Sequence, residues 1–420
     1  MTEETQQKLR QDLRRIVIFF KWLVCSILSG AVIGSVGTLF FYCMDIATKL
    51  REGDPWVIWF LPLAGILIVG IYKVFHNEKD SGTNLVLAAI HSGENLPLQM
   101  APSIFISTVI THLFGGSAGR EGAALQLGGS LGAGLGKLFR FDEKDQKIMI
   151  MCGMSAAFSA LFGTPMAAAI FPMEVVSVGV MYYVALVPCV ISSLVAHGIA
   201  SYFHVAPELF PLKDLPPFSI PNALRVTVLA LACAGVSILF CVLLHTVTHL
   251  YRKWLKNPYL RVFVGGCLVL GLTFLVQSRD YNGAGMQVIA NAVNKGQAMP
   301  AAFLLKMIFT ALTLGAGYKG GEIVPSFFVG ATFGCVLGGL LGLSPTLCAA
   351  VGMSAVFCGV TNCPVTSLLI SFELFGYGGM PFFLLSIALS YMMSGYFGLY
   401  ATQRIPYSKF RIEYINRKTH

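Results

Sequence analysis

The chain has 420 residues with 29 Lys or Arg and 20 Asp or Glu, so charged side chains make up 12% of it, where a soluble domain carries about 25%. Hydrophobic residues make up 55% of the chain, and its mean hydropathy is +0.72. These values exclude a disordered chain and most soluble folds, because polar groups are too few to cover the surface, and they indicate a protein surrounded largely by lipid.

Uncharged apolar runs recur along the chain at residues 22–44, 148–173, 175–207 and 226–251. A membrane-spanning helix needs about 20 such residues. The runs are continuous and do not alternate with period two, which favours helices over a β-barrel. The first run is longer than a signal-peptide core and lacks a convincing cleavage site, so we expect it to remain as a membrane helix. We therefore predict an all-α polytopic membrane protein.

The net charge of +9 comes mainly from both ends and one loop. Membrane proteins concentrate Lys and Arg in this way on the cytoplasmic side. We expect a multi-pass protein of the plasma (inner) membrane with both termini in the cytoplasm, and no nucleic-acid partner. The basic residues concerned are Lys8, Arg10, Arg14, Arg15, Lys21, Arg252, Lys253, Lys256, Arg261, Arg404, Lys409, Arg411, Arg417 and Lys418.

Metal and disulfide chemistry are not expected. The 11 Cys are scattered singly, mostly inside apolar runs, and show neither CxxC pairs nor zinc-type spacing. His245 and His249 lie four residues apart, but no third ligand accompanies them. We therefore predict no metal and no cofactor.

The chain contains an internal repeat. GMSAAFSALFGTP begins at Gly153 and GMSAVFCGVTNCP begins at Gly352, an offset of 199 residues. Upstream lie two Gly-rich turns that each contain a glutamate, residues 119–121 and 320–322, at an offset of 201. A duplicated membrane unit is the simplest explanation of these markers.

The repeat divides the chain. A segment with five prolines, residues 207–221, separates the halves. We predict a first membrane repeat at 22–206, a linker at 207–221 and a second repeat at 222–403. The flanks are a cytoplasmic N-terminal segment at 1–21 and a basic cytoplasmic tail at 404–420.

The two halves are expected to be inverted, because the first long helix has its basic flank at its start whereas its counterpart has the heavier basic flank at its end. Inverted repeats are typical of transporters whose site lies where the repeats meet. Gly and Pro clusters also break the apolar runs beside the glutamates. Broken helices are tolerated at membrane depth only where they face protein or a water-filled cavity.

Glu121 is the first candidate for chemistry. Its glycine-rich turn opens a helix, whose free N–H groups and dipole form an anion site that a tethered carboxylate can occupy. An acid at mid-bilayer costs about 2.5 to 3.5 kcal/mol, and a helix terminus returns about 0.3 to 2 kcal/mol, so protonation or a free anion can displace it. The alternative is a local pair with Arg120 at a helix cap.

Glu322 occupies the corresponding turn of the second half, and the repeat favours a functional role over that of a loop acid beside Lys319. Glu174 and Glu373 end apolar runs, and we interpret them as interfacial or helix-end acids.

Two further features have ordinary explanations when taken alone. The turn from Ser81 to Asn84 precedes a short apolar helix, where its side chains could donate to an anion but more simply cap the helix. Tyr400 lies near the C-terminal membrane boundary, where an aromatic-belt position is the default.

These residues together resemble the CLC family of chloride channels and anion/proton antiporters, over nearly the whole chain. The GREG turn at residues 119–122 is similar to that family's GREGP signature, with Ala123 in place of Pro. The segment at 153–175 is similar to the family's stretch of small residues around a central Pro.

The resemblance implies a homodimer in which each subunit has its own pore. It implies that Glu121 is the gating glutamate, that Tyr400 faces the central anion site, that residues 81–84 match the filter segment GSGIP, and that residues 321–325 match GxFxP. Because the chain continues for only about twenty residues past Tyr400, we expect no regulatory domain. The anion-binding residues expected in this way are Ser81, Gly82, Thr83, Asn84, Gly122, Ala123, Ile323, Val324 and Tyr400, with Glu121 and Glu322 in gating and proton transfer.

Departures from the family pattern point to a branch. Glu322 stands where a neutral residue is usual, and Val175 replaces the internal glutamate of chloride/proton members. Together with a GREG turn that lacks the following Pro, these changes resemble the fluoride/proton antiporters. Thr83 and Val324 differ from that branch, where Met and Thr are usual.

We therefore expect a secondary-active anion/proton antiporter that exports fluoride, with a chloride exchanger or passive anion channel as the alternative. Its partners would be fluoride or chloride, protons, membrane lipid and a second copy of the chain. An intramembrane enzyme is disfavoured, since the sequence contains no HExxH, no GxSG serine and no aspartate pair inside an apolar run. A purely structural protein would not need paired buried acids.

Overall fold

The computed structural model describes residues 3–78, 81–213 and 215–420. This part of the chain forms sixteen α-helices, three short 3-10 helices and one two-stranded sheet. Six of its helical segments are long and apolar enough to cross a membrane. Large apolar side chains such as Leu194 and Leu268 are exposed on the outside, as expected for a surface that faces lipid.

Eight helices belong to each half of the chain. The first half contains α1 (Glu3–Gly53), α2 (Leu61–Val74), α3 (Thr83–Ser92), α4 (Met100–Leu113), α5 (Glu121–Leu138), α6 (Glu143–Phe162), α7 (Pro165–Val175) and α8 (Leu186–Tyr202). The second half contains α9 (Ile220–Trp254), α10 (Pro258–Val276), α11 (Met286–Lys295), α12 (Ala302–Ala316), α13 (Ile323–Leu340), α14 (Pro345–Thr361), α15 (Pro364–Phe375) and α16 (Met380–Met393). The 3-10 helices are Pro55–Phe60, Tyr183–Ala185 and Tyr377–Gly379.

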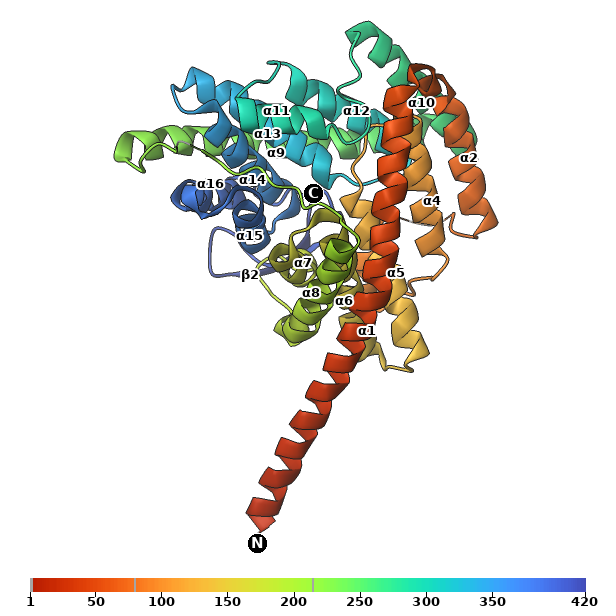
Figure 1. Cartoon of the computed structure of the whole chain (residues 1–420), viewed down its shortest axis with the longest axis vertical. Coiled ribbons are helices and arrows are strands. Elements are labelled where there is room, and N and C mark those ends of the chain that lie inside the picture. Colours follow the sequence, from red (N-terminus) through yellow and green to blue (C-terminus); the bar gives the residue numbers. More distant parts are fainter. Residues whose placement is uncertain (1–2, 79–80, 214) are drawn as a thin grey trace.

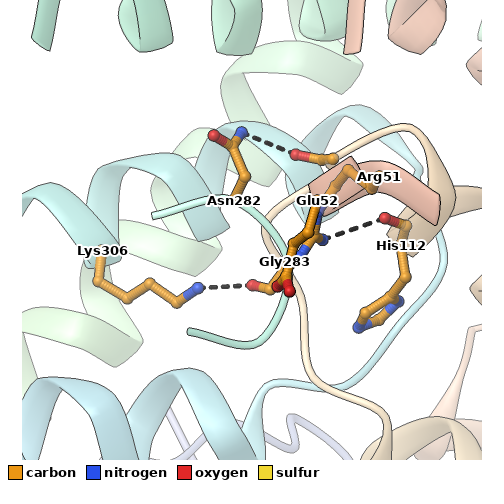
Figure 2. A network of polar contacts seen from close by, with 7 residues as sticks. Arg51, Glu52, His112, Asn282, Gly283 and Lys306 are labelled. Atoms are coloured by element: carbon orange, nitrogen blue, oxygen red, sulfur yellow. Dashed lines mark hydrogen bonds and ion pairs between the residues drawn. The ribbon is translucent and has the colours of Figure 1, made fainter. Parts of the chain in front are cut away.

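The helix lengths follow the repeat. Helices α5 and α13 both have 18 residues, and α3 and α11 both have 10. Helix α1 runs along the body, and its N-terminal part extends beyond the other helices (Figure 1). The prediction of a helical polytopic fold built from two inverted repeats is confirmed, with the C-terminal two-stranded sheet as an addition that was not predicted.

The repeated GMSA motif is explained by helix packing. A Cβ placed on Gly153 of α6 would lie 2.1 Å from the Gly128 carbonyl oxygen of α5, and one on Gly352 of α14 would lie 2.3 Å from the Gly330 oxygen of α13. Small residues of this kind allow the backbones of membrane helices to approach closely. The motif therefore allows the same close crossing in each half, between α5 and α6 in the first and between α13 and α14 in the second.

The breaks after these motifs also have a local cause. Gly163 ends α6 and Asn362 ends α14, both with positive φ (74° and 59°), and Pro165 and Pro364 then start α7 and α15. The resulting helices have 11 and 12 residues, fewer than the roughly 20 that a full span needs. The predicted broken helices are confirmed.

The segment after the last membrane helix is folded. Strands β1 (Arg404–Tyr407) and β2 (Tyr414–Lys418) form an antiparallel hairpin. The Arg404 carbonyl accepts a hydrogen bond from the Val178 backbone N–H just after α7. The predicted basic tail thus packs against the end of a first-half helix.

Candidate functional site

The two glutamate-bearing turns meet each other. Gly119 and Gly321 exchange two backbone hydrogen bonds, each with an N···O distance of 2.7 Å. Because α5 begins at Glu121 and α13 at Ile323, two helix N-termini, one from each half, converge at this bridge. The positive ends of helix dipoles favour negative charge nearby.

Glu121 is buried at the start of α5, with 1% of its side chain exposed. Its Oε2 accepts a hydrogen bond from the Arg120 N–H at 3.1 Å, and its Oε1 lies 3.5 Å from Arg120 Nε. The local pair with Arg120, one of the two alternatives from the sequence, is therefore present. Arg120 is shared, since it also binds the linker residue Glu208 at 3.0 Å and lies over the ring of Phe41.

Glu322 lies on the other side of the bridge. Its Oε2 is shielded from solvent and makes no hydrogen bond within the described residues. A Cβ placed on Gly122 would lie 3.2 Å from this oxygen, so the Glu322 carboxylate packs directly against the first turn of α5. The two turns approach so closely that a side chain at position 122 would clash with the turn of the second half, which explains why this residue is glycine.

The turn at residues 81–84, which the resemblance matches to a filter segment and which we call the filter turn, does not follow the ordinary N-cap interpretation. Helix α3 begins at Thr83, and the capping position is held by Gly82 with φ 69°, so no side chain caps the helix. Asn84 is instead tied to Thr402, whose N–H and hydroxyl each lie 3.0 Å from Asn84 Oδ1. The oxygen of Thr83 accepts a hydrogen bond from Gln126 Nε2 at 3.3 Å.

Tyr400 is not part of an aromatic belt, because only 1% of it is exposed and it lies in the protein interior. Its hydroxyl has no hydrogen-bond partner among the described residues. The loop that carries it is held from behind, since the hydroxyl of Thr419 donates to the Tyr400 carbonyl at 2.6 Å. A buried hydroxyl without a protein partner is a group that a ligand can satisfy.

A cavity of about 730 Å³ joins several of these parts. Of the predicted site residues it is lined by Ser81, Gly82, Asn84 and Glu322. It is also lined by Leu399, the neighbour of Tyr400. The other seven predicted residues do not line it, although all of them are buried: Glu121, Gly122, Thr83, Ala123, Ile323, Val324 and Tyr400.

The charged residues that line this cavity are mostly basic. Lys73, Arg252, Arg261 and Lys319 line it, whereas its acids are Glu78 and Glu322. Several cations in a concave site raise the local concentration of small anions. The cavity therefore suits an anion that approaches Glu322.

Gln126 lines the cavity but was not among the site residues predicted from the sequence. Gln126 lies on α5, five residues after Glu121, and its side chain reaches the filter turn. Its sequence signal is a lone side-chain amide in the apolar, glycine-rich stretch at residues 122–129.

Comparison with known proteins places these features in context. Residues 64–395 match the voltage gated chloride channel family. The chain is 36% identical to a chloride/fluoride channel protein of Pseudomonas syringae pv. tomato, over 93% of this chain and 87% of the relative. It is 26% identical to the H(+)/Cl(-) exchange transporter ClcA of Vibrio cholerae, over 84% of this chain and 82% of the relative.

Solved structures agree with the sequence matches. A CLC-type fluoride/proton antiporter superposes with a TM-score of 0.89 at 31% identity, covering 92% of this chain and 98% of the other. A slow cyanobacterial Cl-/H+ antiporter superposes with a TM-score of 0.77 at 18% identity, covering 89% and 94% of the two chains.

Proposed function

Because the chain belongs to the voltage gated chloride channel family, we propose that it is an anion/proton antiporter that exports fluoride in exchange for protons. The relatives that handle fluoride support this choice of anion. The observation that carries the proposal is the Gly119–Gly321 bridge, which places two carboxylate-bearing turns, one from each half, against each other. The protein is accordingly a transporter and not an enzyme.

Glu121 is proposed as the gate. As a carboxylate it occupies the N-terminal end of α5 and excludes a free anion, because both compete for the same positive dipole. Once it is protonated, the competition ends, and an anion takes its place. Return of the side chain then carries the proton across the site.

Glu322 is proposed as the second proton site. It lines the cavity, and its Oε2 has no protein partner among the described residues. When protonated, this carboxyl can donate an O–H···F⁻ hydrogen bond, and charge-assisted bonds of this kind are short and strong. When ionised, it repels the anion. Occupancy by fluoride is thereby linked to a proton.

Uphill proton movement tests the proposal. Purified protein is reconstituted into vesicles, and a fluoride gradient is imposed without a pH gradient. We expect the fluoride gradient to drive protons in the opposite direction until they accumulate. Passive fluoride flux without proton movement would contradict the proposal.

A second candidate function is chloride exchange, or a passive chloride channel. Thr83 favours it, because its hydroxyl can replace the filter serine of chloride-handling members. The rates of chloride and fluoride efflux from the same vesicles decide between the two anions.

We also propose that the protein lies in the inner membrane with both termini in the cytoplasm, and that two copies associate. The basic residues of the hairpin support the orientation. The apolar outer surface, which includes Leu194 of α8, is suited to contact with a second copy as well as with lipid. Labelling of cysteines introduced at either end of the chain, from one side of a sealed membrane, tests the orientation. Cross-linking in native membranes tests the dimer.

A further inference from the structure

Gln126 joins two features of the site that the sequence does not connect. It is 4% exposed, and its amide packs flat against the filter turn, since a Cβ placed on Gly82 would lie 3.5 Å from Nε2 and 3.9 Å from Oε1. Both Gln126 and Gly82 line the cavity that contains Glu322. Its Oε1 is buried without a hydrogen-bond partner among the described residues.

The hydrogen bond from Gln126 determines how the Thr83 hydroxyl can bind other groups. Gln126 Nε2 donates to the Thr83 oxygen at 3.3 Å. A hydroxyl has one hydrogen to donate and two lone pairs to accept with. Because its oxygen already accepts from Gln126, the Thr83 hydrogen is left to donate elsewhere, and the amide keeps a second N–H.

Asn84, the residue after Thr83, has a different role. The side-chain oxygen of Asn84 is bound by both the N–H and the hydroxyl of Thr402, which anchors the filter turn to the loop after Tyr400. The turn is thus fixed from one side by Thr402, and Thr83 is oriented from the other side by Gln126.

We propose that Gln126, which lines the cavity, and Thr83, to which it donates, act as a donor pair that binds the transported anion, with Gln126 as a specificity-determining residue. This inference rests on the proposed function, and it adds a ligand from α5 to the site. Two fixed hydrogen-bond donors favour a small anion with concentrated charge, because such an anion gains most from short, charge-assisted bonds.

Anion binding tests the pair independently of transport. Sodium fluoride and sodium chloride are titrated separately into the purified full-length protein by calorimetry. The variants are Gln126→Met, Thr83→Val and their combination, with Gln146→Met as the matched control. Gln146 also donates a hydrogen bond from its side-chain amide, in this case to the Phe141 carbonyl, but it does not line the cavity.

We expect Gln126→Met and Thr83→Val each to weaken fluoride binding about tenfold, the effect of losing one hydrogen bond to a charged group. Chloride binding should weaken less, so that the fluoride-to-chloride ratio falls. The double variant should bind more weakly than either single variant but lose less than the product of the two losses, because each residue also orients the other. Gln126→Glu, which can only accept from Thr83, should also lose fluoride affinity, and Thr83→Ser should recover what Thr83→Val loses.

Unchanged affinity in Gln126→Met, or losses that add in the double variant, would overturn the pair. Melting temperatures of all variants identify any that fail to fold, and Gln126→Glu then provides the test for a misfolded Gln126→Met. Failure of the proposed function has a different signature: the wild-type protein would bind the anion but move no protons with it.

Discussion

Glu174 and Glu373 each cap the helix on which the other lies. The Glu174 carboxylate, at the end of α7, accepts hydrogen bonds from Val365 N and Thr366 N at the start of α15, at 2.9 and 2.8 Å. The Glu373 carboxylate, at the end of α15, accepts from Met166 N and Ala167 N at the start of α7, at 2.8 and 2.9 Å. This reciprocal pair shows that the two short helices run antiparallel, as inverted repeats require.

Loss of either cap should lower stability, and Glu174 should matter more. Glu174 is 5% exposed and also accepts from the Thr366 hydroxyl at 2.6 Å, whereas Glu373 is partly exposed and, among the described residues, accepts from two backbone donors alone. We expect Glu174→Leu to cost about 3 kcal/mol and Glu373→Leu about 1 to 2 kcal/mol, because buried N–H groups lose their acceptors. Melting temperatures in detergent check the order. Equal losses would contradict the geometry.

Gly153 should not tolerate a methyl group. In Gly153→Ala the new Cβ would lie 2.1 Å from the Gly128 oxygen, so α6 must move away from α5, which carries Glu121. We expect a stability loss of about 2 kcal/mol or more, with reduced transport. Gly235→Ala on α9 is the matched control, since its Cβ would meet nothing within 4 Å. A Gly153→Ala protein as stable as the control would show that the tight crossing is unimportant.

The basic lining of the cavity should speed anion entry. Arg252 lines the cavity, whereas its neighbour Lys253 does not. We expect Arg252→Gln to slow fluoride transport about threefold at low ionic strength, with the difference fading in high salt as the charges are screened. Lys253→Gln should have little effect in the same vesicle assay. A salt-independent defect in Arg252→Gln would point to a structural cause.

Lys409 of the hairpin should make the folded protein more stable as the pH rises into the alkaline range. Its amine donates to the Tyr391 carbonyl at 2.9 Å and to Asn362 Oδ1 at 2.5 Å, and burial lowers the pKa of Lys409 to about 8. The unfolded chain has a Lys pKa of about 10.4. The folded state therefore binds this proton more weakly, and the protein gains stability as the pH rises from about 8 to about 10.4.

Melting curves of wild type and Lys409→Met across that pH window check this sign. The wild type should gain on the variant as the pH rises, because the variant has no charge to lose. Parallel curves would show that the amine does not titrate there.

Much of the architecture was predictable because it depends on local patterns. Apolar runs, prolines and the glycine that ends α6 mark the helices and their breaks. The Gly119 and Gly320 turns marked the two candidate carboxylates. These features are properties of short segments, and the internal repeat makes them easier to recognise because each one occurs in both halves of the chain.

The remaining features depend on contacts between distant segments. The acceptors Glu174 and Glu373 meet donors 191 and 207 residues away, and Asn84 meets Thr402 across 318 residues. Gln126 and Tyr400 are uncharged residues whose importance lies in what surrounds them. Pattern and composition do not encode such pairings.

In the proposed mechanism, the carboxylate of Glu121 both competes with the anion and carries the proton. Simultaneous recording with fluoride and pH electrodes, on vesicles containing wild type, Glu121→Gln or Glu322→Gln, tests both roles at once. We predict coupled fluoride and proton movement in wild type, no proton movement in Glu121→Gln, and weakened coupling in Glu322→Gln. A Glu121→Gln protein that still exchanges protons for fluoride at the wild-type ratio would contradict the mechanism.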